Sequence, residues 1–280
     1  SISIYYDCKC SDRRRDYTMK SHYLKMDFYR CFFSAQMILA VLGVCAVHIL
    51  IPQQFIEPRV SVLRSFNVAW SSNAMVLVYI FTTLAYGQSF CEDMEHGYYK
   101  YGVIRGNQPA YAISKCIVIV FSAIFSMAAG RFLFVVGMRL FYPWEAPFDL
   151  GEVELLVEIG CFSGLLKEGH YFIYVLIHGI WQGIWAAVLA LFSVFISFYT
   201  ANRLLVLAFP VMLHHLLRRV SHLWNDDWVK FDPDHIFLIN YNAWGNEKIS
   251  LSAGAISGLF LCLLLSGLIC RKFKRRAENG

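Results

Sequence analysis

Charged residues are scarce in this chain of 280 residues. Lys, Arg, Asp and Glu make up 16% of it, against about 25% in an ordinary globular domain. Hydrophobic residues make up 58%. This balance argues against a soluble globular fold and predicts an integral membrane protein.

Several motifs are missing as well. No G-x-x-x-x-G-K-[ST] occurs, so the chain cannot by itself cradle nucleotide phosphates, and the H-E-x-x-H and G-x-S-x-G motifs of hydrolases are absent. The first residues are polar and lack the apolar stretch of a secretory signal peptide. We therefore expect the N-terminus to stay in the cytoplasm.

What the chain does have is long apolar segments. A helix needs about 20 predominantly apolar residues to cross the hydrocarbon core. Six segments meet or approach this length: Phe32–Pro52, Val68–Phe90, Cys116–Gly137, Tyr171–Tyr199, Leu204–Leu217 and Leu251–Cys270. The fifth contains Pro210 and ends in two histidines, so a broken or re-entrant span is the alternative there.

Charge placement supports six spans with both termini in the cytoplasm, because cytoplasmic loops collect Lys and Arg. In this topology the inner segments hold 16 basic residues and the outer segments hold 8. An odd number of spans would place the basic tail RKFKRR outside, which argues against a seven-helix receptor.

The predicted fold is all-α, with one membrane domain. We expect a polar extension at 1–18, an interfacial helix at 19–33 and a six-helix domain at 32–270. Within that domain, a short docking helix is expected at about 91–106 and outer loops at about 139–169 and 218–250. A basic cytoplasmic tail at 271–280 follows.

Polar residues in or near the spans give further candidates. The histidines are His48, His178, His214 and His215. Intramembrane ionisable groups are often functional, although a neutral His in an interhelical hydrogen bond is the more frequent state. Arg131 lies about 24 Å along its helix from Lys115, which predicts a place near the outer interface, where snorkelling explains it.

Two further patterns in the chain are weaker evidence for a functional site. An outer loop carries Asp226, Asp227, Asp232 and Asp234. Their spacing fits no EF-hand, so we expect a solvated acidic surface and no metal. Gly179-x-x-x-Gly183 and Gly254-x-x-x-Gly258 allow close helix packing, either within one chain or between two.

The polar block from Ser89 to Lys115 separates two long apolar runs. Glu92, Asp93 and Glu95 open it, and basic residues follow, an order that favours a short helix because acids lie near its positive end. A simple connecting loop needs no such order. The block is therefore interpreted as a docking element at the cytoplasmic surface.

This block resembles the first intracellular segment of six-helix permease subunits of ABC-type exporters. The matching positions are Asp93, Glu95, Gly97, Lys100, Arg105 and Lys115. The interfacial helix, the six spans and the missing phosphate loop are also similar to that family. One departure is Tyr98, where the family often has Thr after the Gly.

The resemblance implies that Glu92 to Arg105 is a coupling helix that docks on a separate ATPase subunit. It implies no catalysis and no cofactor on this chain, with ATP and Mg²⁺ bound by the partner. The expected partners are that ATPase, a second permease copy or paralogue and the lipid bilayer, without nucleic acid. The expected location is a bacterial plasma membrane.

Substrate and alternatives are less constrained by the sequence. Trp70, Phe81, Trp181 and Trp185 are candidates to line a cavity for a peptide, antibiotic or lipid-like compound. The alternative is a membrane-embedded enzyme or scaffold that uses the intramembrane histidines and the outer Asp cluster. An ion-coupled secondary transporter is disfavoured, because no Asp or Glu lies inside the six predicted spans and no internal repeat is evident.

Overall fold

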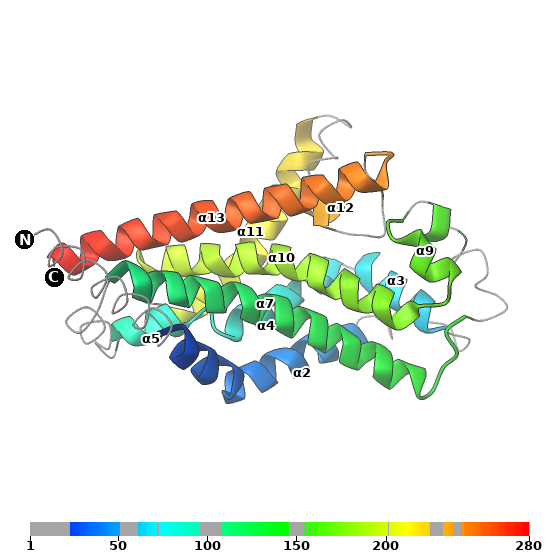
Figure 1. The fold of residues 1–280 in the computed structure, drawn as a ribbon, viewed down its shortest axis with the longest axis horizontal. Helices are drawn as coiled ribbons and strands as arrows, with labels where there is room; N and C mark the ends of the chain where they lie inside the picture. Colours follow the sequence, from blue (N-terminus) through cyan, green and yellow to red (C-terminus); the bar gives the residue numbers. More distant parts are fainter. Residues whose placement is uncertain are drawn as a thin grey trace, which may run out of the picture.

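The computed structural model describes residues 23–50, 61–71, 73–95, 108–145, 154, 156–158, 160–200, 202–224, 232–237, 242 and 244–279. These residues form helices joined by turns, without a strand among them. The longest helices run side by side as an elongated bundle (Figure 1). The all-α prediction is confirmed for the described part of the chain.

Helices α7 (Gln108–Arg139) and α10 (Tyr171–Ser197) form the centre of the bundle. Small residues allow this close contact: a Cβ at Gly179 would lie 2.8 Å from the Cα of Ala128, and one at Gly183 would lie 2.7 Å from the Cα of Ile124. The first small-residue motif is therefore used within the chain.

Helix α13 (Glu247–Asn279) packs on α7 and α10 and uses the second motif. A Cβ at Gly254 would lie 2.9 Å from the carbonyl oxygen of Ile236 and the ring of Trp181, and one at Gly258 would lie 2.5 Å from the side chain of Ile184. Of the two alternatives left open by the sequence, packing within one chain is the one observed for both motifs.

The N-terminal part of the described chain is a bent pair of helices. Helix Tyr23–Phe32 meets α2 (Ala35–Leu50) at 53°. Ser34 lies at the bend: its hydroxyl donates to the Cys31 carbonyl at 2.7 Å and accepts from the backbone N–H of Met37 at 3.1 Å. This side chain caps the start of α2, as Ser commonly does.

The predicted second span, Val68–Phe90, is not one continuous helix. The chain forms α3 (Val62–Ser71), the 3₁₀ helix η2 (Asn73–Leu77), α4 (Val78–Leu84) and α5 (Ser89–Glu95). Ser and Asn around the first break compete for backbone hydrogen bonds, which disfavours a helix interior. Gly87 lies in the second break, between α4 and α5, where a Cβ would be 2.6 Å from the Thr83 carbonyl oxygen.

The predicted third and fifth spans are longer in the structure. Helix α7 begins at Gln108 rather than near Cys116, with Pro109 in its first turn, where the missing N–H has no cost. Helix α11 (Arg203–Trp224) is a single 22-residue helix that contains Pro210, so the broken or re-entrant alternative is wrong. Two short helices, α9 (Ser163–Lys167) and α12 (Pro233–Phe237), complete the described elements.

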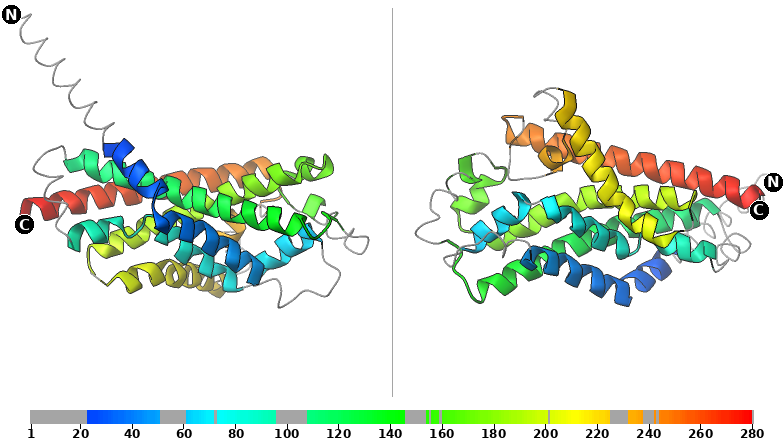
Figure 2. Two further views of the ribbon diagram at one scale, coloured as in Figure 1. Left: turned by 90° about the horizontal axis from the view of Figure 1, so that it is seen from below. Right: turned by 180° about the vertical axis from the view of Figure 1, so that it is seen from behind.

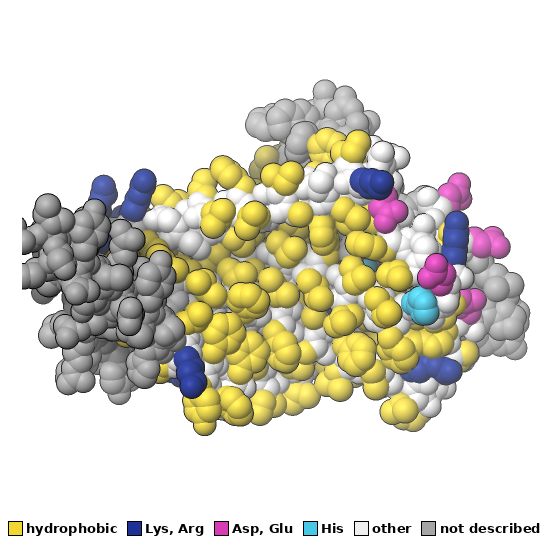
Figure 3. Space-filling view, viewed as in Figure 1, with side chains coloured by type: hydrophobic (Ala, Val, Ile, Leu, Met, Phe, Trp, Pro, Cys, Tyr) yellow, Lys and Arg dark blue, Asp and Glu magenta, His cyan; other side chains and the backbone are white. Residues whose placement is uncertain are grey.

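Among the described residues, four helices are long and apolar enough to cross a membrane: Gln108–Arg139, Tyr171–Ser197, Arg203–Ser221 and Glu247–Arg276. The bent pair Tyr23–Phe32 and Ala35–Leu50 adds a fifth if it is one span. Hydrophobic side chains cover the middle of the face in Figure 3, and the charged side chains visible there lie toward its two ends. This distribution suits a bilayer solvent.

Candidate coupling site at one end of the bundle

Segments far apart in the sequence meet at one end of the bundle, which we call the α5 end. Figures 1 and 2 show α5, the beginning of helix Tyr23–Phe32 and the C-terminal end of α13 together there. Contacts confirm this arrangement: Arg203 of α11 bonds Glu95 of α5, and the ring of Phe273 lies 6.1 Å from that of Phe90.

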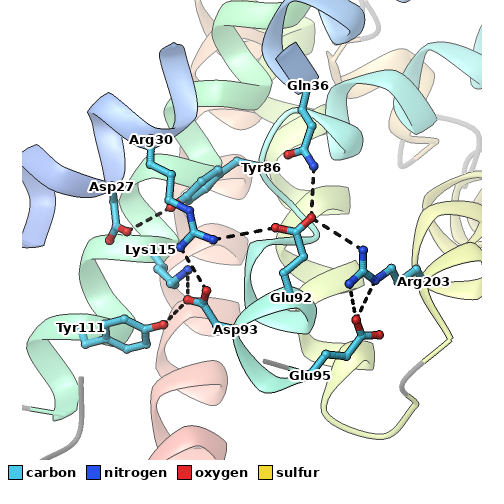
Figure 4. Close-up of polar contacts among 10 residues, drawn as sticks. All are labelled: Asp27, Arg30, Gln36, Tyr86, Glu92, Asp93, Glu95, Tyr111, Lys115 and Arg203. Atoms are coloured by element: carbon cyan, nitrogen blue, oxygen red, sulfur yellow. Dashed lines mark hydrogen bonds and ion pairs between the residues drawn. The ribbon is translucent and has the colours of Figure 1, made fainter. Parts of the chain in front are cut away.

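Asp93 is the buried centre of this end, with 2% of its surface exposed. Its Oδ1 accepts a hydrogen bond from Arg30 Nη1 at 3.1 Å, and its Oδ2 lies 2.5 Å from Lys115 Nζ and accepts from the Tyr111 hydroxyl. Figure 4 shows this carboxylate between the three donors. It thereby links α5 to helix Tyr23–Phe32 and to α7.

The charged state of Asp93 is the stable one. Burial by itself raises the pKa of this carboxyl, but the Lys115 ammonium and the Tyr111 hydroxyl outweigh that effect and hold the pKa below its ordinary value. The carboxyl of Asp93 is therefore ionised at neutral pH.

Lys115 is fully buried on α7. Its Nζ lies 5.4–5.5 Å from the ring centroids of Tyr86, Phe90 and Tyr111, in addition to its contact with Asp93. Aromatic faces attract a desolvated cation, so these rings complete the cage around the ammonium.

Glu92 and Glu95 connect α5 to two other helices. Glu95 Oε2 accepts from Arg203 Nε at 3.0 Å and from Arg203 Nη2, while Glu92 Oε1 lies 4.0 Å from Arg203 Nη1. Gln36 of α2 donates to Glu92 Oε1 at 3.1 Å (Figure 4). The three acids of α5 thus face three cations from three other helices.

Asp27 forms a second buried carboxylate at this end, 1% exposed. It accepts a hydrogen bond from the Tyr86 hydroxyl at 3.0 Å and from the Ser114 hydroxyl at 2.7 Å. Helix Tyr23–Phe32 is therefore held to α7 and to the chain just before α5.

The sequence found only part of this site. The acids Glu92, Asp93 and Glu95 lie together on α5, whereas Gly97, Lys100 and Arg105 lie outside the described residues. The missed members are Asp27, Arg30, Gln36, Tyr86, Tyr111 and Arg203. A signal for Arg203 existed: it is the lone basic residue of its inner loop, on the same predicted side as three acids.

A pocket of about 320 Å³ opens beside α5, next to the turn between α10 and α11. Cys91 and Glu95 line one side and Arg276 of α13 lines another, where its Nη1 donates to the Phe198 carbonyl at 3.3 Å. Burial raises the pKa of the Cys91 thiol. The pocket brings α5, the α10–α11 turn and α13 to one surface.

Arg131 does not snorkel to an interface, which corrects the sequence-based explanation. It is fully buried between α7 and α10. Its Nη1 lies 2.5 Å from His178 Nδ1 and its Nη2 donates to Gln182 Oε1. The cation is held by polar partners on the facing helix, because an isolated buried charge is too costly.

His214 belongs to a second polar group, outside the α5 end. Its Nδ1 accepts from Trp185 Nε1 at 3.1 Å, and its Nε2 lies 3.4 Å from Asp234 Oδ1. Burial by itself raises the pKa of Asp234, but His214 and Arg218 outweigh that effect and lower it. Of the other predicted aspartates, Asp232 is buried, and Asp226 and Asp227 lie outside the described residues.

The predicted cavity aromatics contact three different elements. Phe81 fills the space over Gly43 of α2, Trp181 lies against Gly254 of α13, and Trp185 stacks on Phe237 of α12 with centroids 5.0 Å apart. The side chain of Trp70 lies outside the described residues. Within the described part of the chain, no cluster of three or more His, Cys, Asp or Glu could hold a metal ion.

Comparison of the chain with known protein families gives no match, and comparison with curated proteins gives none either. A functional assignment therefore rests on the residues and their arrangement.

Proposed function

We propose that this chain is the transmembrane permease subunit of an ATP-driven exporter, with α5 as the start of the helix that receives the push of a separate ATPase. One observation carries the proposal: α5 is tied by ion pairs to helix Tyr23–Phe32, α7 and α11. A short helix anchored by ion pairs to three neighbouring helices is suited to transmit force.

The proposed topology has six spans and both termini in the cytoplasm. Four candidate spans and α2, the second helix of the bent pair, supply five, and the broken path through α3, η2 and α4 supplies the sixth. Broken helices are tolerated at membrane depth when protein surrounds them. Leu63 and Phe66 of α3 are buried, which meets that condition. Helix Tyr23–Phe32 is the proposed interfacial element.

The mechanism uses ATP only on the partner. Two such permease chains, identical or paralogous, would enclose a substrate path, and closure of two ATPase subunits on ATP would displace α5. A ligand shifts a conformational equilibrium only by its differential affinity for the two states. Here the ATPase dimer supplies that difference, and the buried Asp93–Lys115 pair carries the displacement into α7.

The cargo we propose is a peptide, antibiotic or lipid-like compound that leaves the cell through a bacterial plasma membrane. The aromatic side chains of the spans support an amphipathic cargo. Binding of a fluorescent amphipathic peptide to purified protein, lost with Trp181→Ala, would test this assignment.

The exposed ion pair of Arg203 and Glu95 gives a test of coupling that leaves the fold intact. Arg203→Glu places a carboxylate beside two others, which repels α5 from α11. We expect ATP-driven transport in membrane vesicles to fall about tenfold while protein yield stays constant, because exposed ion pairs contribute little to stability. The double variant Glu95→Arg with Arg203→Glu restores the attraction and should recover most of the transport. Equal transport by all three proteins would count against force transfer through this contact.

The His214–Asp234 contact favours the alternative of a membrane-embedded enzyme, because a His–Asp pair can act as a general base. In this chain, however, both ring nitrogens are engaged, one by Trp185 and one by Asp234, and His214 is 1% exposed. No ring nitrogen is left to take a proton from a substrate. The contact is better explained as a tie between α10, α11 and α12.

A further inference from the structure

Two cysteines from different helices contact each other near the α5 end. The thiols of Cys116 on α7 and Cys270 on α13 hydrogen-bond to each other, and the Ser266 hydroxyl also hydrogen-bonds to Cys116. The two helices run antiparallel here: the rings of Tyr111 and Phe273 lie 5.4 Å apart, about one turn closer to the α5 end. The register of the helix pair therefore brings the thiols together.

The two sulfurs differ in access. Cys116 is 2% exposed and packs in the core cluster, whereas Cys270 is half-buried at the edge of that cluster. Cys270 is the more accessible of the two thiols, and Cys116 lies beside it as the resolving thiol. Such an arrangement of an accessible thiol next to a second thiol is typical of redox-sensing sites.

We propose that Cys116 and Cys270 form a dithiol site that a hydroperoxide oxidises to a disulfide. The Cys270 thiolate attacks the peroxide oxygen, which gives a sulfenic acid and releases an alcohol, or water from hydrogen peroxide. The Cys116 thiol then attacks the sulfenic sulfur, the S–S bond forms, and the sulfenic oxygen leaves as water. The two thiols lose two electrons and two protons, and the peroxide O–O bond is reduced.

The bond would join α7 to α13 one residue from Lys115, the buried partner of Asp93. Oxidation thereby fixes the helix into which α5 is anchored. The site itself does not depend on the proposed export function, but its effect on transport does. In a reducing cytoplasm the disulfide would form only under oxidative stress, as transient redox-sensing disulfides do.

The chain provides a matched control. Cys262 lies two turns before Cys270 on α13 and is also half-buried, and within the described residues its side chain contacts no other thiol. The Cys262→Ser variant should therefore leave the oxidation unchanged, whereas Cys116→Ser and Cys270→Ser should abolish it.

The test is peptide mapping on membranes from cells that make the chain. Membranes are treated with hydrogen peroxide, alkylated with N-ethylmaleimide and digested with trypsin. We expect peptides 116–131 and 249–271 to be joined with the loss of two hydrogens in the original chain and in Cys262→Ser, and to be separate after dithiothreitol. Absence of the joined peptide in the original chain, or its persistence in Cys270→Ser, would overturn the proposal.

A transport measurement tests the effect of the disulfide separately from its formation. Peroxide should lower ATP-driven transport at least tenfold in the original chain, reversibly with dithiothreitol, and should not affect the Cys116→Ser variant. Unchanged transport with the disulfide fully formed would contradict the locking of α7. If transport is absent even in reduced membranes, the export function is contradicted. The dithiol site is still tested in that case, because the joined peptide forms or fails to form independently of transport.

Discussion

Replacement of Asp93 by Asn is expected to destabilise the protein by about 3–5 kcal/mol, because it leaves a buried ammonium without its counter-charge. Asn keeps the shape of the side chain but not its charge, and Lys115 cannot move to water from its fully buried position. Thermal unfolding of the purified protein in detergent should show a midpoint lower by roughly 10 °C, at about 2–4 °C per kcal/mol.

Two further variants make this experiment decisive. The double variant Asp93→Asn with Lys115→Met removes both charges and should recover most of the lost stability, because a neutral pair of similar volume often replaces a buried ion pair without loss. Glu95→Gln serves as the control on the same helix, since Glu95 is exposed and should change the midpoint little. A single Asp93→Asn variant as stable as the original would refute the buried-pair interpretation.

The charge of Asp93 also predicts a pH dependence. Because folding lowers the pKa of this carboxyl, its stabilising contribution is complete above the ordinary carboxyl pKa of about 4 and is lost as the pH falls below it. The Asp93→Asn variant should lack this part of the acid sensitivity. The same unfolding measurement at several pH values would detect the difference.

Replacement of Gly97 by Pro is expected to abolish transport and the stimulation of the ATPase while leaving membrane insertion intact. Gly97 follows α5 by two residues, in the middle of the predicted coupling helix at 91–106. Proline removes a backbone donor and clashes with the preceding turn, so the part of the segment beyond Glu95 could not continue as a helix. The anchors Asp93 and Glu95 lie before it and keep their contacts.

The matched control is Gly97→Ala, which favours a helix over glycine by about 1 kcal/mol. Transport in vesicles and ATP hydrolysis by the reconstituted pair are the measurements, normalised to the amount of inserted chain. We expect near-normal values for Ala and background values for Pro. Normal transport by Gly97→Pro would exclude a helical coupling role for this segment.

Composition and periodicity predicted the class of the protein well, because a membrane helix is specified by its length and apolarity alone. They failed where polar residues join a helix. The apolar run that begins at Cys116 places Lys115 at the end of the polar block, at the start of the next helix, yet α7 begins at Gln108 and buries Lys115 within its third turn. A charged residue that has a partner on another helix can lie inside a helix and does not mark its end.

Partners across helices are the other part that the sequence could not predict. Arg131 meets His178 and Gln182, 47 and 51 positions away, only because Gly179 and Gly183 let α10 approach α7 closely. Asp27 lies in the predicted interfacial helix at 19–33, where an acidic side chain is expected to face water, but it is buried against Tyr86 and Ser114. Such pairings depend on helix register, which a single sequence does not reveal.

The most direct test of the export function is purification of this chain from its native cell in mild detergent. The proposal predicts that an ATPase subunit with a nucleotide-binding domain copurifies with it. It also predicts that the ATP hydrolysis of the pair falls to the level of the isolated ATPase with Gly97→Pro, but not with Gly97→Ala. The proposal would be contradicted if the chain purifies intact without an ATPase partner and if the ATP hydrolysis of the membranes is unchanged when this chain is removed from the cell.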